Sequence, residues 1–415
     1  MKSIRWLLLF FPVAVAAEFL HWGDLVIFAT ASLAIIPIAG VLGEATESLA
    51  EKTGPQIGGL LNASLGNAAE LIITIVAISA GKIALVKASI IGSILGNLLF
   101  VLGLSILLGG LKHGTQKFDR NRVSVDATLV ILAAITISIP SLFNELIEPN
   151  FQRVETLSLA TAAVVLVLYG LSIFYTLRQP SAARNGHAPA IEPTHAGPHW
   201  NTGKALLIMV VAVAGLAVMS EFLVGSLETV SATFGLSEFF VGIILVPLIG
   251  NVAEHLVAVQ VAMKDQMDLS LSIALGSSLQ IALFVAPLLV FVSLFMGNPM
   301  TLEFNHPEIL AMVTASIIAA LVAIDARSNW LEGATDEPRP ALWPLRSSDR
   351  PASLAADYQL EVDPQTHRIT YHEQGKRVAM EWSPGSDHGL YFETIEFWLD
   401  DQGTRTPVSE EEQVE

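Results

Sequence analysis

The chain contains no cysteine, so it can form no disulfide framework, no thiolate metal site and no cysteine nucleophile. Charged residues make up only 15% of the 415 residues, and there is no basic patch or recognition motif of a nucleic-acid-binding protein. The His-Glu-x-x-His motif and any evident activated serine are also lacking. We therefore expect neither an enzyme nor a nucleic-acid-binding protein.

Hydrophobic residues are abundant instead. They make up 52% of the chain, and the mean hydropathy is +0.57. These values are typical of an integral membrane protein in a lipid bilayer rather than of a soluble domain of this size. Charge is uneven, because residues 331–415 hold 18 acidic and 7 basic residues and account for most of the net charge of −17. The acidic character thus belongs mainly to the C-terminal tail.

A helix needs about 20 apolar residues to cross the hydrocarbon core, and ten segments meet this requirement. They lie at about residues 5–21, 24–43, 57–80, 83–109, 122–141, 156–177, 204–224, 237–262, 268–296 and 306–325. Basic residues favour one side of these spans by twelve to three, which predicts that the N- and C-termini are cytoplasmic. The first span, which ends at Ala14-Val15-Ala16, also fits a cleaved signal peptide, but a retained helix is the simpler interpretation.

The chain contains an internal repeat, which a shift of 184 residues brings into register without gaps. The shift matches Glu44 with Glu228, Gly66-Asn67 with Gly250-Asn251, Ala69-Glu70 with Ala253-Glu254, and Gly92-Ser93 with Gly276-Ser277. The matching helices are the third and the eighth, five crossings apart, so they run in opposite directions through the bilayer. Inverted repeats are typical of secondary transporters, which bind their substrate near the midplane where the halves meet.

These patterns predict an all-α integral membrane protein with about ten transmembrane helices in two inverted repeats, followed by a small β-rich soluble tail. The expected parts are a leading helix at 1–22, a first repeat at 23–177, a cytoplasmic linker at 178–203, a second repeat without its last helix at 204–330, and an acidic cytoplasmic tail at 331–415. Alternating patterns in the tail predict short strands at 358–362, 367–371, 378–382 and 390–398, a turn at Gln374-Gly375 and a disordered end after about Gly403.

Two repeat-matched carboxylates, Glu70 and Glu254, lie within apolar spans. A carboxylate at that depth is costly unless it faces the bundle interior or a water-filled path. One such residue can be a protonated structural glutamate, but a repeat-matched pair favours a function. Amide and hydroxyl oxygens complete an all-oxygen set, which consists of Glu70, Glu254, Asn67, Asn251, Ser93 and Ser277.

An all-oxygen set suits a hard cation, and its flexible geometry favours Ca²⁺ over Mg²⁺. When the cation leaves, repulsion between the carboxylates and their desolvation favour protons in the same place. Occupancy shared between a cation and protons is the minimal chemistry of an antiporter.

Further polar residues are candidates for the ion or proton pathway: Glu221, Glu44, Glu228, Gln280, Ser278 and His255. Glu44 and Glu228 lie toward span ends, where an ordinary helix-end or interfacial charge explains them equally well. Glu221 lies deeper in its span but has a proline as its repeat counterpart. For His255, a proton relay and a histidine satisfied within the bundle both remain open.

The paired motifs resemble the signature regions of the calcium/proton antiporter (CAX) family. They are Gly66-Asn67-Ala68-Ala69-Glu70 with Gly92-Ser93-Ile94-Leu95, and Gly250-Asn251-Val252-Ala253-Glu254-His255 with Gly276-Ser277-Ser278-Leu279-Gln280. The resemblance covers about residues 1–333. It implies one leading helix plus two inverted five-helix repeats, proton-driven export of Ca²⁺ or a related divalent cation, and central roles for Glu70 and Glu254.

One departure from the family is visible. Its members resemble eleven-helix proteins, whereas here a proline-rich polar region follows residue 333 in place of a last helix. We expect a secondary transporter that exchanges Ca²⁺ for H⁺ in a bacterial plasma membrane, with Ca²⁺ as its transported substrate and no cofactor. The alternatives left open are an Na⁺/H⁺, K⁺/H⁺ or Na⁺/Ca²⁺ exchanger, and from another class a cation channel or a transport-impaired regulatory protein. A homo-oligomer is also left open.

Overall fold

The computed structural model describes residues 5–144, 151–178, 200–324 and 327–328, together with six short strands between residues 358 and 407. The chain divides into two compact units, Met1–Ala334 and Thr335–Glu415, each of which is described by itself. Most of the predicted linker, residues 179–199, lies outside the described residues, as does the predicted turn at Gln374-Gly375.

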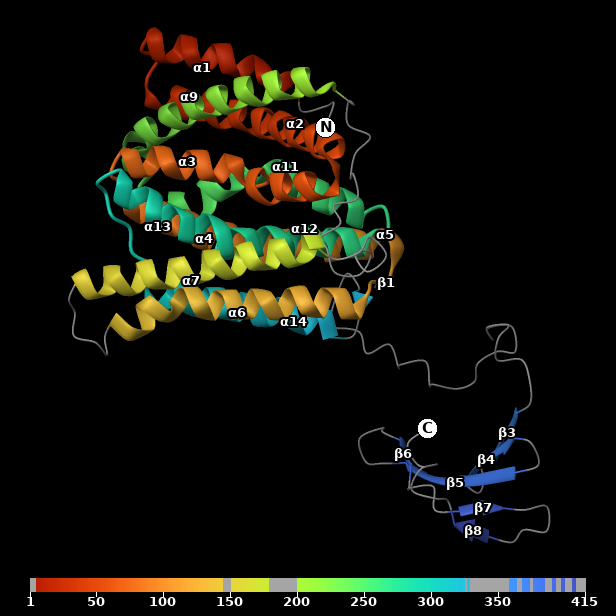
Figure 1. The fold of residues 1–415 in the computed structure, drawn as a ribbon. Coiled ribbons are helices and arrows are strands. Elements are labelled where there is room, and N and C mark those ends of the chain that lie inside the picture. Colours follow the sequence, from red (N-terminus) through yellow and green to blue (C-terminus); the bar gives the residue numbers. More distant parts are fainter. Residues whose placement is uncertain are drawn as a thin grey trace. The chain divides into compact units, whose positions relative to one another are not determined.

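The first unit is almost entirely helical (Figure 1). Its helices are η1 (Arg5–Leu9), α1 (Phe10–Phe19), α2 (Asp24–Leu65), α3 (Ala68–Ser79), α4 (Ile83–Leu95), η2 (Gly96–Val101), α5 (Leu102–His113), α6 (Arg120–Asn144), α7 (Phe151–Arg178), α9 (Thr202–Phe234), α10 (Glu238–Phe240), η3 (Val241–Leu245), α11 (Val246–Ala262), α12 (Met267–Gln280), η4 (Ile281–Val285), α13 (Ala286–Phe295) and α14 (His306–Ile324). Of the η segments, η1 is a 3-10 helix and the other three are π-helical.

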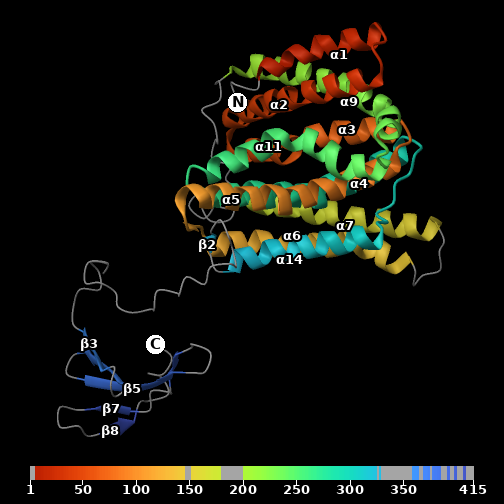
Figure 2. The ribbon, with the colours of Figure 1, turned by 180° about the vertical axis from the view of Figure 1, so that it is seen from behind.

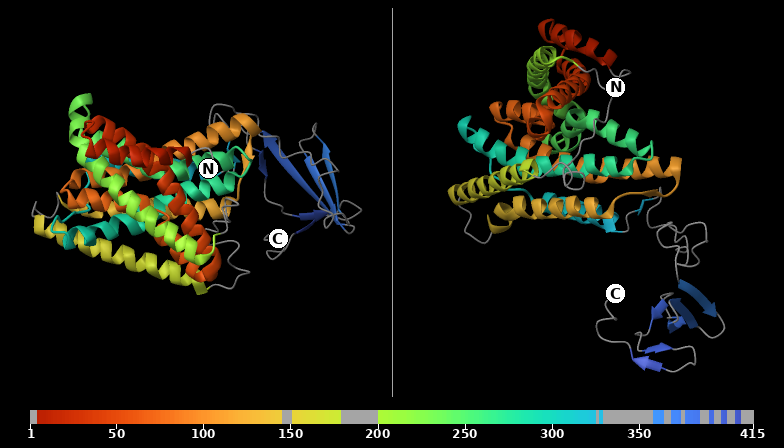
Figure 3. Two further views of the ribbon diagram at one scale, coloured as in Figure 1. Left: turned by 90° about the horizontal axis from the view of Figure 1, so that it is seen from above. Right: turned by 45° about the vertical axis from the view of Figure 1, so that its right-hand side comes forward.

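The helices of this unit form three groups. Helices α1, α2 and α9 pack together on one side, and α6, α7 and α14 pack together on the other (Figures 1 and 2). The helices that carry the sequence motifs, α3, α4, α11 and α12, lie between the two groups, and two further views show the same grouping (Figure 3). The motif residues are therefore enclosed by helices on both sides.

Eight helices in the described part of the chain are long and apolar enough to cross a membrane. The ten predicted spans thus include two that the structure does not form as long helices. The first predicted span consists of η1 and the 10-residue α1. The third is divided, because α2 continues without interruption to Leu65 and the 12-residue α3 begins only at Ala68. Glycine and asparagine, which are both poor helix formers, lie at this break at positions 66 and 67.

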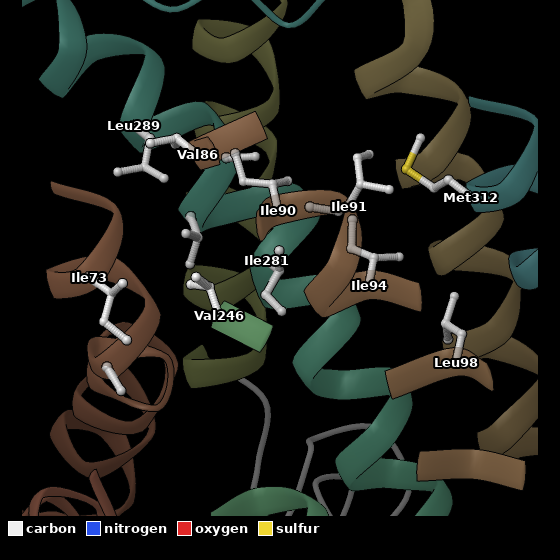
Figure 4. Close-up of a cluster of buried hydrophobic side chains, with 14 of the residues drawn as sticks. Ile73, Val86, Ile90, Ile91, Ile94, Leu98, Val246, Ile281, Leu289 and Met312 are labelled. Atoms are coloured by element: carbon white, nitrogen blue, oxygen red, sulfur yellow. The ribbon is translucent and has the colours of Figure 1, made fainter. Parts of the chain in front are cut away.

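Buried aliphatic side chains fill the space between the motif helices. Ile90, Ile91 and Ile94 of α4 belong to the same core cluster as Val246 of α11 and Ile281 of η4 (Figure 4). Such close packing fixes the relative positions of α4, α11 and α12, since interiors of this density leave few voids. The polar motif residues consequently lie on a rigid frame.

Close backbone contact also joins the two halves at a motif glycine. A Cβ atom placed on Gly92 would lie 2.1 Å from the carbonyl oxygen of Ile243 in η3, so only glycine fits there. Its repeat counterpart Gly276 has nothing within 4 Å of the same position. The two halves are therefore packed differently at equivalent residues.

A short antiparallel pair connects distant parts of the first unit. Strand β1 (Gln116–Lys117) pairs with β2 (Arg327–Ser328), in the register Gln116 with Ser328 and Lys117 with Arg327. Arg327 and Ser328 come shortly after the end of α14 at Ile324. In the structure they form an extended pair with the loop after α5.

The second unit contains antiparallel strands within the predicted tail. The strands are β3 (Tyr358–Asp363), β4 (Arg368–Glu373), β5 (Lys376–Pro384), β6 (Leu390–Phe392), β7 (Phe397–Leu399) and β8 (Arg405–Pro407), in the order β3-β4-β5-β7-β8 with β6 beside β5. The predicted strand at 390–398 corresponds to two strands, β6 and β7. The sequence predicts disorder after about Gly403. In the structure, β8 lies in this stretch and pairs with β7.

Candidate functional site

Glu70 lies in the first turn of α3, where the helix restarts after Gly66 and Asn67. The unsatisfied backbone N–H groups of a helix N-terminus carry a partial positive charge, which favours a carboxylate in this turn. The Glu70 side chain is buried, and its Oε1 atom has no hydrogen-bond partner among the residues that the structure describes. The break in the helix thus presents a buried, unsatisfied carboxylate at the centre of the bundle.

Glu254, the repeat counterpart of Glu70, lies in the middle of α11 rather than at a helix end. Its Oε2 atom is also buried and without a partner. A Cβ atom placed on Gly250, one turn earlier on α11, would lie 3.7 Å from Cγ and 4.0 Å from Cδ of Glu70. The Glu70 side chain therefore packs against the helix that carries Glu254, and the charges of the two carboxylates are close enough to interact.

The motif asparagines and serines pair across the two halves of the chain. Ser277 Oγ donates to Asn67 Oδ1 at 3.3 Å, and Asn251 Nδ2 donates to Ser93 Oγ at 3.2 Å. Each bond joins the asparagine of one motif to the serine of the other, as two repeats that face each other would arrange them. All four side chains are buried. The structure thus brings together all six residues predicted for the central site, since the Glu254 carboxylate lies close to Ser277.

Two further polar residues extend this cluster as predicted. Gln280 at the end of α12 accepts a hydrogen bond from Asn67 Nδ2 at 2.6 Å. His255 on α11 is buried, and its Nε2 lies 3.2 Å from Asn97 Oδ1. Both residues are therefore tied to the central polar set.

Asn97 belongs to the cluster, although sequence reasoning missed it. It is 1% exposed at the start of η2, and its Nδ2 donates to Ser277 Oγ at 3.0 Å. The repeat could not reveal it, because its counterpart is Ile281. The available signal was its position four residues after Ser93, which places a lone amide on the motif face of an apolar helix.

Two predicted pathway residues form no hydrogen bond with this cluster among the described residues. The hydroxyl of Ser278 donates to Ala274 O of its own helix at 3.0 Å. The Glu221 side chain is exposed on α9. Neither residue contacts the six central side chains among the hydrogen bonds of the described residues.

Glu44 is buried in α2 and accepts a hydrogen bond from Arg5 Nη2 at 2.6 Å, which forms an ion pair. Both residues line a small, partly open hollow between α2 and α11. Ala253, the neighbour of Glu254, lines the same hollow. The pair therefore lies beside a hollow that reaches the helix carrying the central carboxylate.

Glu228, the repeat counterpart of Glu44, also pairs with a base, but it is exposed. Lys82, which precedes α4, forms ion pairs with Glu228 of α9 and with Glu238 at the start of α10, the latter at 2.9 Å. The hydrogen bonds that Lys82 donates to these two carboxylates, the one to Glu228 first, raise the pKa of Lys82 above its ordinary value. Repeat-matched glutamates are thus each neutralised by a basic residue from another element.

The central cluster contains two carboxylates and no more. Across the residues that the structure describes, no group of three or more histidine, aspartate or glutamate side chains gathers as a metal site. Two carboxylates with amide and hydroxyl oxygens match the ligand preference of a hard cation that is bound and released rather than held permanently. The buried, unsatisfied carboxylate oxygens are the atoms that such a cation or protons would satisfy.

Comparison with known proteins agrees with this chemistry. A family model described as "Sodium/calcium exchanger protein" matches residues 24–178 and 204–335. A Ca(2+)/H(+) antiporter of Aphanothece halophytica is 44% identical over 343 residues, which cover 79% of this chain and 91% of that protein. The Ca(2+)/H(+) antiporter ChaA of Bacillus subtilis is 40% identical over 325 residues, 78% of this chain and 92% of that protein.

Solved structures show the same fold. The structure of native YfkE matches with a TM-score of 0.69 at 37% identity, over 80% of this chain and 95% of that one. An H+/Ca2+ exchanger CAX shares the fold with a TM-score of 0.62 at 15% identity, over 79% of this chain and 84% of that one. The matched region leaves out the C-terminal unit, since the family model ends at residue 335.

Proposed function

The chain belongs to the sodium/calcium exchanger family, and we propose that it is an integral membrane antiporter that exchanges Ca²⁺ for H⁺. The resemblance to calcium/proton antiporters that the motifs indicated is confirmed by relatives that carry this name at 40–44% identity. Those relatives are named as transporters, not as enzymes, and their names do not favour a channel or an exchanger of Na⁺ or K⁺. Ca²⁺ is the transported substrate.

One observation carries the mechanism: Glu70 and Glu254 each keep a buried carboxylate oxygen without a partner while they lie within reach of each other's charge. Burying a carboxylate without a partner is costly, and two such groups together cost more. A divalent cation between them removes both negative charges. Protons on the carboxylates do the same, so the two ions compete for one place.

Around these carboxylates, we propose that four side chains supply neutral oxygens to the cation. They are Asn67, Asn251, Ser93 and Ser277. Their cross-half pairing supports an arrangement in which both repeats contribute ligands to one site at their junction. Gln280 and His255 hold this set in place through their hydrogen bonds to Asn67 and Asn97. Glu44 and Glu228 act at the entrances on opposite sides of the membrane.

The arrangement in the membrane is part of the proposal. We infer two inverted repeats, 23–177 and 204–330, after a leading helix at 1–22, with both termini in the cytoplasm of a bacterium and the protein in its plasma membrane. The positive-inside distribution of basic residues supports this orientation. Residues 178–203 then form a cytoplasmic linker, and residues 331–415 form a separate acidic β-rich tail. A homo-oligomer remains compatible with all of these features.

The test is calcium uptake into liposomes that contain the purified full-length chain and carry an imposed pH gradient. Wild-type protein should take up Ca²⁺ only when the gradient is present, and Glu70→Gln and Glu254→Gln should each abolish uptake. Glu155→Gln on α7, a carboxylate away from the cluster, is the control and should leave uptake unchanged. Uptake that follows a sodium gradient instead, or that persists in both glutamine variants, would contradict the proposal.

A further inference from the structure

The polar cluster contains one residue that makes its two halves different. Asn97 is fully buried and bonded on both sides of its amide: Nδ2 donates to Ser277 Oγ at 3.0 Å, and Oδ1 faces His255 Nε2 at 3.2 Å. The equivalent position in the other half holds Ile281, which is 1% exposed and has no group that can form a hydrogen bond. Ser277 therefore accepts from Asn97, an amide outside the repeat-matched pairs, whereas Ser93 accepts from the motif asparagine Asn251.

The hydrogen bonds around Asn97 run in one direction. Asn97 Oδ1 can only accept, so its hydrogen bond with His255 Nε2 requires the imidazole proton on that nitrogen, and Asn97 Nδ2 in turn donates to Ser277. Ser277 donates to Asn67, and Asn67 donates to Gln280. A hydroxyl has a single proton. Because Asn97 occupies a lone pair of the Ser277 oxygen, the single proton of this hydroxyl is directed at Asn67 Oδ1.

In the other half the direction is reversed. Ser93 receives its hydrogen bond from Asn251 Nδ2, so Asn251 uses its amide nitrogen, and not its carbonyl oxygen, for the bond between halves. Asn67 uses its carbonyl oxygen for the equivalent bond. A hard cation binds carbonyl oxygen and not amide nitrogen. The two repeat-matched asparagines are therefore not equally ready to bind a cation.

We propose that Asn97 is a positioning residue that makes the two half-sites unequal, so that an incoming divalent cation is met first by the carbonyl oxygen of Asn251 and only afterwards by that of Asn67. It acts through Ser277, whose hydroxyl proton it directs at the Asn67 side. His255 holds the Asn97 amide in the required orientation, since a rotated amide would present Nδ2 to the imidazole and Oδ1 to Ser277. This inference rests on the proposed function of the site.

A merely structural role for Asn97 makes a different forecast. If Asn97 only satisfies hydrogen-bonding groups in a buried region, its loss lowers the amount of folded protein. The apparent KM of the protein that does fold then stays unchanged. If Asn97 is a positioning residue, its loss changes the KM for Ca²⁺. It also changes how much the effect of removing Asn67 on the KM differs from the effect of removing Asn251. The comparison of Asn67 with Asn251 therefore separates the two roles.

The experiment measures initial Ca²⁺ uptake against Ca²⁺ concentration in liposomes with a fixed pH gradient, normalised to folded full-length protein by size-exclusion chromatography. Asn97→Leu keeps the approximate shape but removes both hydrogen bonds, and it should raise the KM about tenfold with a smaller effect on the maximal rate. Asn97→Ser is a second, milder variant in case the leucine variant does not fold. Ser105→Ala on α5 removes another buried hydroxyl, one that has no partner, and should leave the KM unchanged.

The decisive comparison uses Asn67→Ala and Asn251→Ala in two backgrounds. With Asn97 present, Asn251→Ala should raise the KM about fivefold more than Asn67→Ala does; with Asn97→Leu, the two substitutions should have equal effects. Equal effects in the wild-type background, or a difference that persists without Asn97, would overturn the proposal while leaving proton-driven exchange intact.

A parallel measurement keeps the inference separate from the exchange reaction. Calcium binding to the detergent-solubilised protein, measured by isothermal titration calorimetry on the same variants, should show the same inequality in Kd. If wild-type liposomes showed no proton-driven uptake, the proposed function would fail, and this binding series alone would decide the role of Asn97.

Discussion

Ser277 Oγ donates a hydrogen bond to Asn67 Oδ1, although 210 residues separate the two in the chain. The equivalent bond in the other direction joins Asn251 to Ser93. Two bonds related by the 184-residue shift thus connect the halves at the same place. This relationship makes the coupling between residues of different repeats measurable.

Removal of Asn67 and of Ser277 should not be additive. We expect the double variant Asn67→Ala/Ser277→Ala to lose about 1 kcal/mol less stability than the sum of the single variants, because either substitution alone already breaks the shared bond. Thermal unfolding in detergent, followed by tryptophan fluorescence, provides the measurement. The non-bonded combination Asn67→Ala/Ser93→Ala is the control and should be additive to within about 0.5 kcal/mol.

The motif glycines should respond differently to alanine. Gly92→Ala would place a methyl group 2.1 Å from the Ile243 carbonyl oxygen, so α4 and η3 would have to separate, and we expect a loss of about 2 kcal/mol or more. Gly276→Ala meets open space and should be neutral or slightly stabilising in the helix. Melting temperatures of the two variants test this contrast, and equal values would show that the close contact is absent in the membrane protein.

The ion pair of Arg5 with Glu44 should affect stability mainly because Glu44 is buried. The Glu44 side chain is 6% exposed and that of Arg5 41%, so Arg5→Gln leaves an uncompensated carboxylate in a buried place. We expect a loss of about 1–3 kcal/mol for Arg5→Gln, most of which the double variant Arg5→Gln/Glu44→Gln should recover. A double variant no more stable than Arg5→Gln alone would assign the loss to something other than the unpaired charge.

The titration of Lys82 in its ion pairs should give a pH dependence of stability at high pH. The hydrogen bonds that Lys82 donates to Glu228 and Glu238 raise the pKa of Lys82, so its contribution is complete below the ordinary lysine value of about 10.4 and is lost as the pH rises through the raised pKa. The melting temperature of wild type should therefore exceed that of Lys82→Met by a small, constant amount between pH 7 and 9. A difference that disappears within this range would refute the assignment.

Removal of the C-terminal unit should leave transport largely intact. The family match ends at residue 335 and the first compact unit at Ala334, so a chain that stops after Ala334 retains all motif helices. We expect its Ca²⁺ uptake in liposomes to remain within about twofold of the full chain. Complete loss of uptake in a folded, truncated protein would show that the tail takes part in transport.

Much of this molecule could be predicted from sequence because its repeat is ungapped. The matched pairs Asn67 with Asn251 and Ser93 with Ser277 were enough to place four polar side chains at one junction, and the structure brings them into contact. The apolar runs likewise located the long helices. Both the repeat and the hydropathy can be read from the sequence. In lipid, apolar segments must form helices to satisfy their backbone hydrogen bonds, so these two features predict much of the structure.

What sequence could not supply is where the symmetry fails. Asn97 has no polar counterpart, so no matching argument could select it. The helix ends at Leu65 before the first motif but runs through the equivalent Gly250 and Asn251 of the second, although both motifs read Gly-Asn. Local propensities are equal at the two places, and only the surrounding packing decides which helix is interrupted.

The π-helical segments η2 and η4 occupy equivalent places directly after the two serine motifs. A turn closed by i→i+5 bonds contains one residue more than an α-helical turn, so everything downstream is rotated by about 100° relative to a regular helix. A helical wheel drawn through residues 83–113 or 267–295 will therefore assign lipid-facing and core-facing positions wrongly beyond the motif. Mutagenesis or cross-linking designed on such a wheel must restart its phase at Leu102 and at Ala286.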